Sequence, residues 1–171
     1  MKKLMISAFA VAFAAVTQAA MLDWSFYDWS DDGDFEGMKV YAMLGDTAKT
    51  DWTSASEIAS ASIDNATLAG DDSGYIFAAG QAKSDSLVKG TDASLYFVVV
   101  DSVNNKFDVT EVATVDGSLI YGEQESTPGA FEGLDSDYLS GEWKTFAAPE
   151  PTSGLLLLLG VAGLALRRRR A

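Results

Sequence analysis

One stretch near the N-terminal end of the chain has the residue types and spacing of a cation-binding loop. In DWSDDG, oxygen-bearing side chains fall at positions one, three and five, and glycine falls at position six. Asp28, Ser30 and Asp32 supply these oxygens, and Glu36 stands at position nine. Calcium loops carry a bidentate glutamate at position twelve, where this chain has Lys39. The stretch is thus a partial match that predicts a candidate Ca²⁺ site, with a solvated acidic loop as the alternative.

Acidic side chains are so abundant that they indicate no particular catalytic site. The chain has 25 Asp and Glu residues, and glycoside hydrolysis needs two carboxyl groups about 5–10 Å apart. Pairs of this kind arise by chance in such a sequence, so a small secreted glycoside hydrolase is the weakest of our hypotheses. The chain has no His and no Cys, which excludes Ser-His-Asp and Cys-His catalysis, thiolate zinc sites and disulfides. We therefore predict that the protein is not an enzyme and that it needs no cofactor.

Aromatic residues provide another candidate site. If DWSFYDW is a strand, Trp24 and Phe26 share one face while Tyr27 and Trp29 share the other. One pair is then expected in the core and the other on a half-exposed face that could stack on sugar rings, although aromatic side chains more often fill cores. The side chains considered for sugar stacking are Trp24, Tyr27, Trp29, Trp52 and Trp143.

The charge of the chain is divided unevenly along its length. The formal net charge is −13, but residues 21–148 hold 6 Lys against 24 acids, which gives this section a net charge of −18. A surface of this sign repels nucleic acid and anionic lipid headgroups. We therefore predict no nucleic-acid partner.

The N-terminal residues have the three parts of a secretory signal peptide. Lys2 and Lys3 form a positive region, and the apolar run Leu4–Val16 follows it. Small residues come next, and a small-x-small pattern favours cleavage by signal peptidase between Ala19 and Ala20. The alternative, an N-terminal core helix, lacks a polar face.

The C-terminal residues combine a rigid acidic segment, a short apolar run and a basic cluster. The run 154–166 contains only apolar residues and glycine, and as a helix it would span about 20 Å, less than the roughly 30 Å hydrocarbon core of a bilayer. The basic cluster is expected to stay in the cytoplasm, which places the acidic middle section outside. The alternative is a buried strand over 155–159 with a solvated basic tail. The rigid acidic segment consists of Pro149, Glu150 and Pro151, and the basic cluster consists of Arg167, Arg168, Arg169 and Arg170.

This order of parts resembles the PEP-CTERM sorting signal of exported bacterial proteins, in which Pro-Glu-Pro precedes a short transmembrane helix and terminal arginines. The resemblance covers 149–171 and none of the middle section. It implies processing near Pro-Glu-Pro by an exosortase, a membrane-embedded enzyme, and delivery to the cell surface or extracellular matrix of an exopolysaccharide-producing bacterium. Because Pro149 and Pro151 fix φ and bias Glu150 toward an extended conformation, the segment is suited to a protease active site.

These observations divide the chain into a signal peptide (1–19), an acidic β-rich extracellular domain (20–148) and the sorting signal (149–171). In the middle section, apolar runs between turn residues predict an antiparallel β-sandwich or jelly roll. Ser54 and Glu57 fit a capping box, which predicts one helix that ends at Asn65 or Gly70, with a strand over 59–63 as the alternative. The predicted strands are 38–44, 75–79, 94–100 (buried on both faces), 106–112 (in a hairpin with the preceding strand), 118–121 and 142–146.

Three functions remain open at this point. The leading hypothesis is a non-enzymatic structural or interaction protein that is held transiently in the inner membrane by its C-terminal helix and then sorted to the cell surface or matrix. The alternative is a carbohydrate- or calcium-binding module of the exopolysaccharide matrix, and the third is the secreted hydrolase. Signal peptidase and an exosortase-type enzyme are the predicted processing partners, and exopolysaccharide is a candidate ligand.

Overall fold

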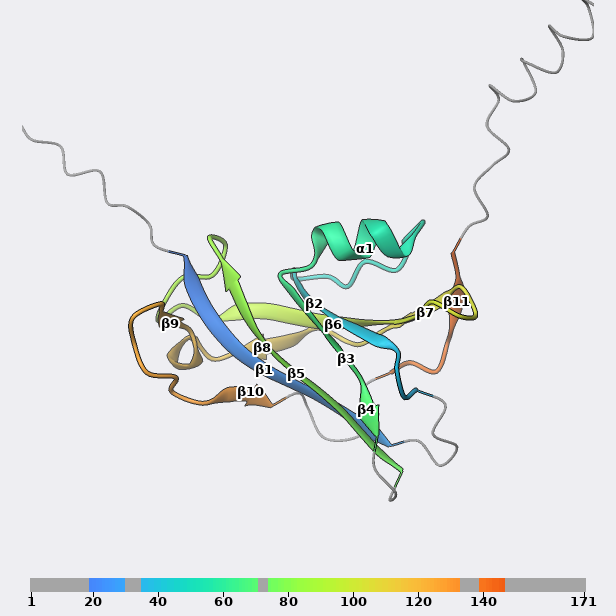
Figure 1. The fold of residues 1–171 in the computed structure, drawn as a ribbon. Helices are drawn as coiled ribbons and strands as arrows, with labels where there is room; N and C mark the ends of the chain where they lie inside the picture. Colours follow the sequence, from blue (N-terminus) through green and yellow to red (C-terminus); the bar gives the residue numbers. More distant parts are fainter. Residues whose placement is uncertain (1–18, 30–34, 71–73, 133–138, 147–171) are drawn as a thin grey trace, which may run out of the picture.

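The computed structural model describes residues 19–29, 35–70, 74–132 and 139–146 (Figure 1). Within these ranges the chain is mainly β, with antiparallel sheets and one α-helix, which confirms the predicted fold class at this level. The signal peptide, cleavage residue Ala19 excepted, and the predicted C-terminal helix lie outside the described residues. No helix in the described part of the chain is long and apolar enough to cross a membrane.

The first of two sheets, called here the outer sheet, is built on a long antiparallel pair. All ten residues of β1 pair with β5, from Ala20 opposite Ser84 to Trp29 opposite Tyr75. The short strand β10 runs parallel to β1, whereas β9 and β4 add to the sheet in antiparallel fashion. The strands of the outer sheet are β1 (Ala20–Trp29), β4 (Ala69–Gly70), β5 (Tyr75–Ser84), β9 (Tyr121–Gly122) and β10 (Ala130–Glu132).

The second sheet, called here the central sheet, has the order β11-β7-β6-β2-β3, and β8 also pairs with β6. Its middle strand β6 is the SLYFVVV run, and every residue from Leu95 to Asp101 is buried, as predicted for a strand covered on both faces. The predicted hairpin with β7 is confirmed by the pairing of Asp101 with Lys106. The strands are β2 (Lys39–Leu44), β3 (Asp64–Thr67), β6 (Ala93–Asp101), β7 (Lys106–Val109), β8 (Ala113–Val115) and β11 (Lys144–Thr145).

Two hydrophobic cores lie on the two faces of the central sheet. The first is shared with the outer sheet, where the rings of Trp24 and Phe26 contact Phe97 at centroid distances of 5.3 and 5.4 Å. The second lies beneath α1 (Ala55–Ala61) and the segment before it, which contribute Ile58 and Trp52. Figure 1 shows α1 on the side of the central sheet that faces away from β1 and β5. The two sheets therefore pack face to face, and the helix forms a partial third layer.

The predicted capping box at the start of α1 is confirmed for Ser54, the N-cap residue, whereas the Glu57 carboxylate accepts from the residue before the N-cap. The Ser54 hydroxyl accepts a hydrogen bond from the Glu57 backbone N–H at 3.2 Å, and the Glu57 carboxylate accepts from the Thr53 backbone N–H at 2.9 Å. The predicted end at Asn65 or Gly70 is wrong, because α1 ends at Ala61. The chain turns there since β3 must pair with β2, beginning with Asp64 opposite Ala42.

The predicted strand over 118–121 is also only partly correct. A 3₁₀ turn, η1 (Gly117–Leu119), occupies most of this segment, and β9 begins at Tyr121. The turn forms because the Asp116 carboxylate accepts a hydrogen bond from the Ser118 backbone N–H at 2.7 Å. Gly117 also packs directly on the backbone of Thr91, where an added Cβ would lie 2.5 Å from the Thr91 nitrogen.

Two connections matter for the arguments below. Leu68 alone separates β3 of the central sheet from β4 of the outer sheet, and its buried side chain belongs to the first core. The chain enters the fold at Ala20, the first residue of β1, and leaves it after Phe146. Figure 1 shows that β1 begins at one end of the domain and that β11 lies at the other.

Candidate functional site

Four aromatic side chains form a row on the solvent-facing side of the outer sheet. They come from the two central strands of that sheet, with Tyr27 opposite Phe77 and Trp29 opposite Tyr75. Ring centroids lie 5.8 Å apart for Tyr27 and Tyr75, 5.4 Å for Trp29 and Tyr75, and 6.3 Å for Tyr75 and Phe77. Trp29 is 59% exposed and Phe77 is 46% exposed. We call these four residues the aromatic row.

The strand periodicity explains why these rings face solvent. Side chains alternate between the two faces of a strand. Ile76, between Tyr75 and Phe77, and Phe26, next to Tyr27, are fully buried in the first core. The prediction that one pair fills the core while the other is half-exposed is therefore confirmed, and the structure shows that Trp24 and Phe26 are the core pair. Large apolar side chains that cluster on a surface usually mark an interaction site rather than a packing role.

A polar cluster follows the aromatic row along the same face. Gln81 lies opposite Asp23 in the register of β1 and β5, and its Nε2 donates to Asp23 Oδ1 at 2.8 Å and to the Tyr121 hydroxyl at 2.9 Å. The Tyr121 hydroxyl in turn donates to Asp23 Oδ1 at 2.9 Å. Between this cluster and the aromatic row stand two small residues, Ser25 and Ala79. Trp29 lies six positions after Asp23 in β1, a distance of about 20 Å along the strand.

The environment of the polar cluster keeps Asp23 ionised and Tyr121 protonated at neutral pH. Burial opposes ionisation of Asp23, but hydrogen bonds from Thr127, Gln81 and Tyr121 outweigh it, so the pKa of Asp23 is lowered. Burial, followed by the hydrogen bond to Asp23, raises the pKa of Tyr121. A ligand that reaches this end of the face therefore meets a carboxylate, an amide and a phenol with fixed roles as acceptors and donors.

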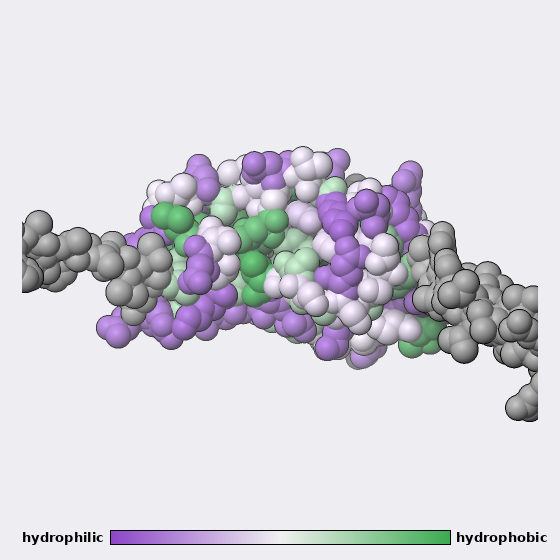
Figure 2. All heavy atoms as spheres, turned by 90° about the horizontal axis from the view of Figure 1, so that it is seen from above, coloured by the Kyte–Doolittle hydropathy of each residue, from purple (hydrophilic) through white to green (hydrophobic). Residues whose placement is uncertain are grey.

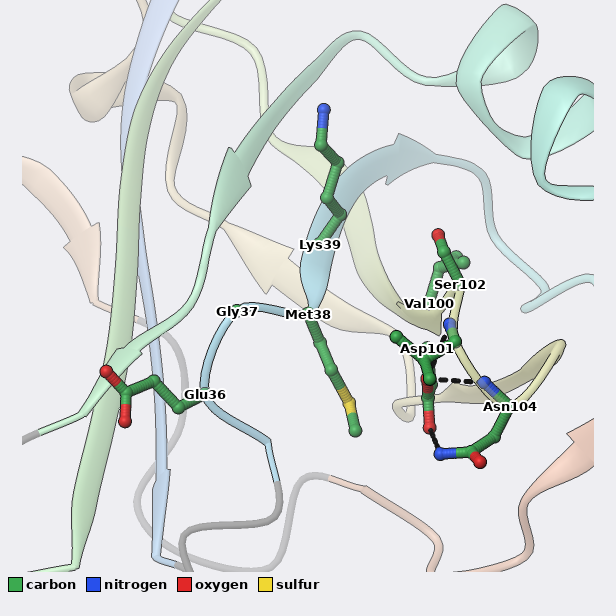
Figure 3. Close-up of a pocket in the computed structure, with 9 residues that line it drawn as sticks. Glu36, Gly37, Met38, Lys39, Val100, Asp101, Ser102 and Asn104 are labelled. Atoms are coloured by element: carbon green, nitrogen blue, oxygen red, sulfur yellow. Dashed lines mark hydrogen bonds between the residues drawn. The ribbon is translucent and has the colours of Figure 1, made fainter.

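A hollow of about 450 Å³ lies elsewhere, between the start of β2 and the turn that joins β6 to β7 (Figure 3). The Asp101 carboxylate on its wall accepts hydrogen bonds from the backbone N–H groups of Val103 (3.0 Å) and Asn104 (2.9 Å), and from Asn104 Nδ2 (2.6 Å). These hydrogen bonds close the β6–β7 turn, so the Asp101 carboxylate has a structural role. Figure 3 shows Glu36 on the opposite side of Met38 from Asp101, so the two carboxylates do not converge.

The face of the molecule on the α1 side has a different character. Figure 2 shows hydrophobic residues there as separate patches among hydrophilic side chains. Trp52 is buried in the second core, with the Lys49 ammonium 4.3 Å from its ring centroid. Trp143 lies on the other side of the central sheet, where it packs against the first core and stacks on Phe35 at a centroid distance of 5.6 Å. These two tryptophans were considered for sugar stacking, and neither belongs to the aromatic row.

The predicted Ca²⁺ set is only partly within the described residues. Asp28 lies in β1 and Glu36 in the turn before β2, whereas Ser30 and Asp32 lie outside the described ranges. Among the residues that the structure does describe, no group of three or more His, Cys, Asp or Glu side chains is placed to hold a metal ion. Calcium binding at this loop stays a prediction.

Sequence reasoning missed half of the aromatic row, because it treated Tyr75 and Phe77 only as strand residues. The signal that could have found them is the alternation in YIFAAGQAKS, where Ile76, Ala78 and Ala82 are apolar and buried while Tyr75 and Phe77 occupy positions of the other face. What the sequence alone does not provide is the pairing of β5 with β1, which places these rings beside Tyr27 and Trp29.

The fold and this surface define a mainly β domain that carries the aromatic row on its solvent-facing side. Comparison with known families adds a sorting signal, because residues 147–170 match the PEP-CTERM protein-sorting motif. This confirms the resemblance drawn from Pro149–Pro151 and the arginine cluster, and it supports export, processing by an exosortase-type enzyme and sorting to the cell surface. Neither the curated proteins nor the solved structures include a match to the chain.

Proposed function

We propose that this protein is a non-enzymatic component of the bacterial cell surface or extracellular matrix, which uses the aromatic row to hold an extended neutral polysaccharide. The observation that carries the proposal is the alignment of four rings on one sheet face, two of them about half exposed. The sorting motif supports the location, since it directs an exported chain to the cell surface. In this proposal the chain passes through the inner membrane, where signal peptidase cuts after Ala19 and the segment 154–166 holds it until processing.

The chemistry of the aromatic row suits sugars. One face of a pyranose ring presents C–H groups that carry a slight positive charge, and the face of an aromatic ring is negative. The contact is apolar and does not depend on the order of the sugar units, so a row of aromatic rings can contact successive units of a polymer. Beyond the row, Asp23 and Gln81 offer carboxylate and amide oxygens as acceptors about 20 Å from Trp29 along the strand, since both N–H bonds of Gln81 are already donated to Asp23 and Tyr121. This distance is long enough to reach hydroxyl groups several sugar units away.

The charge near the aromatic row selects among polysaccharides. Asp23 is on the same strand and the same face as Tyr27 and Trp29, and the section 21–148 has a net charge of −18. A polyuronate or sulfated polymer would be repelled, and at low ionic strength the repulsion would be strongest. We therefore expect a neutral polymer to bind better than an anionic one of the same length.

Binding is tested by affinity electrophoresis of the purified protein through gels that contain a neutral glucan, a neutral mannan or a polyuronate. We expect retardation by at least one neutral polymer, and we expect Trp29→Ala to weaken it about tenfold, the value of one ring contact worth roughly 1.4 kcal/mol. Val103→Ala is the matched control, because Val103 is 93% exposed and lies at the β6–β7 turn away from the row.

Two outcomes would overturn the proposal. If no polymer retards the wild-type protein, the aromatic row does not bind polysaccharide. If analytical ultracentrifugation shows a dimer that Trp29→Ala dissociates, the row is instead the interface with a second copy of the chain.

A further inference from the structure

The last described residue of the chain is fixed in the second core. Phe146 is 6% exposed, and its ring stacks on that of Phe107 with a centroid distance of 5.0 Å and an interplanar angle of 29°. Its backbone N–H donates to the Asn105 carbonyl at 3.2 Å. Just before it, β11 pairs with β7 through Lys144 opposite Phe107 and Thr145 opposite Lys106. We call Lys144–Phe146 the exit segment.

The exit segment leaves almost no free chain before the processing motif. Only Ala147 and Ala148 separate Phe146 from Pro149. From the Cα atom of Phe146 to that of Pro149 is three residues, so the two atoms can be at most about 10 Å apart. The face of the domain that carries Phe107 and Asn105 must therefore lie close to whatever enzyme holds Pro149–Pro151.

Proteolytic sites bind substrate in an extended conformation, with several residues on either side of the cut in the cleft. On the N-terminal side of Pro149, the third residue is Phe146, whose ring is in the core. A cleft that takes three residues before the motif thus competes with the second core for Phe146. The exit segment is attached weakly enough for this exchange, because β11 has two residues and its neighbour in the sheet is β7 alone.

We propose that release of the exit segment from β7 and Phe107 precedes processing at Pro149–Pro151 and limits its rate. The proposal rests on processing by an exosortase-type enzyme, and it adds that the folded domain controls access to the motif. In the closed state Phe146 stays in the second core, and in the open state Lys144–Phe146 become part of the extended substrate. Folding of the domain and removal of its tail are therefore coupled through one aromatic side chain.

The test is a pulse-chase measurement of tail removal from the full-length chain in its host, read by mass spectrometry of the C-terminus. Phe146→Ala removes the ring that closes the exit segment, and insertion of Gly-Ser-Gly-Ser between Ala148 and Pro149 provides free chain without changing the core. We expect both to raise the processing rate about tenfold or more, since burial of a Phe side chain biases a two-state equilibrium by at least that factor. Phe131→Ala is the matched control, because Phe131 is 7% exposed but lies in β10 of the outer sheet.

The outcomes separate this proposal from the processing on which it rests. If the wild-type chain keeps its tail in a host that processes another PEP-CTERM protein, processing fails and this proposal fails with it. If the wild-type chain is processed and the insertion leaves the rate unchanged, the exit segment does not limit access. If Phe131→Ala accelerates processing as much as Phe146→Ala, loss of overall stability is the cause and the exit segment has no special role.

Discussion

Gly80 is the residue at which a single added methyl group should disturb the fold most directly. It lies in β5 opposite Trp24 of β1, and the Trp24 indole crosses it to donate a hydrogen bond from Nε1 to Asp64 Oδ2 at 2.8 Å. A Cβ atom added to Gly80 would lie 2.3 Å from Asp64 Oδ2 and 2.6 Å from a ring carbon of Trp24. Gly80→Ala must therefore displace the indole, the carboxylate or the strand.

The size of the effect follows from what has to move. Trp24 is 1% exposed and packs against Phe97, so it has little room to shift. Overpacking of this kind costs about 1–3 kcal/mol, and loss of a hydrogen bond to a carboxylate costs about 1.5–3 kcal/mol. The lower chain entropy of alanine in the unfolded state offsets about 0.4–1 kcal/mol. We expect Gly80→Ala to lower the free energy of unfolding by about 2–4 kcal/mol.

Urea unfolding followed by far-UV circular dichroism measures this change, with Gly122→Ala as the control. Gly122 is also a strand glycine, but an added Cβ there would be 3.5 Å from its nearest neighbour, an ordinary contact. Trp24→Phe completes a double-mutant cycle, because the shorter ring removes the atoms that clash with the new methyl group. We expect Gly80→Ala to cost about 1–2 kcal/mol less in the Trp24→Phe background. A loss below about 0.5 kcal/mol for Gly80→Ala, or strict additivity in the cycle, would refute the packing argument.

Two further predictions concern acidic side chains that hold turns and termini in place. Asp101→Ala should lower the free energy of unfolding by about 2–4 kcal/mol, because it leaves the N–H groups of Val103 and Asn104 without the acceptor that closes the β6–β7 turn. Urea titration measures this change, and an unchanged unfolding midpoint would contradict the role of Asp101. The hydrogen bond from Lys49, more than any other contact, lowers the pKa of Glu57 from 4.5 to about 2. The stabilising effect of the Glu57 carboxylate is therefore complete above pH 4.5 and is lost as the pH falls toward 2. Thermal unfolding should show a Tm difference between wild type and Glu57→Gln that narrows as the pH falls over this range. A constant Tm difference would show that the carboxylate charge does not stabilise the fold.

The parts of the fold that follow from local pattern were predictable from the sequence. The alternation around Trp24 and Trp29 determines which rings are buried, because a strand offers only two faces. Ser54 determines the start of α1, because its side chain accepts from the Glu57 backbone N–H, which the first turn leaves free. The run that forms β6 is apolar at successive positions and rich in β-branched and aromatic residues, which favours a strand with two covered faces.

The parts that depend on distant pairing were not predictable. The sequence DNAT at Asp64–Thr67 has no strand pattern, and it forms β3 because β2 supplies a neighbouring edge. The aromatic row needs Tyr75 and Tyr27, 48 positions apart, to meet across one strand pair. No local signal encodes that register. The end of α1 was misjudged for the same reason, since pairing of Asp64 with Ala42 redirects the chain before any helix-breaking residue is reached.

The passage of the chain from β3 through Leu68 to β4 has a mechanical consequence. A polymer held on the aromatic row would pull on the outer sheet, whereas the tail leaves from β11 in the central sheet. Tension between these two points must cross from one sheet to the other, and Leu68 is one of the buried residues, with Leu87 and Ile120, at which the chain makes that crossing. Because β1 and β5 are paired over ten residues, a pull along these strands loads many hydrogen bonds together. At the opposite end the two residue pairs of β11 and β7 would separate one after the other, so the domain should yield first where its tail begins.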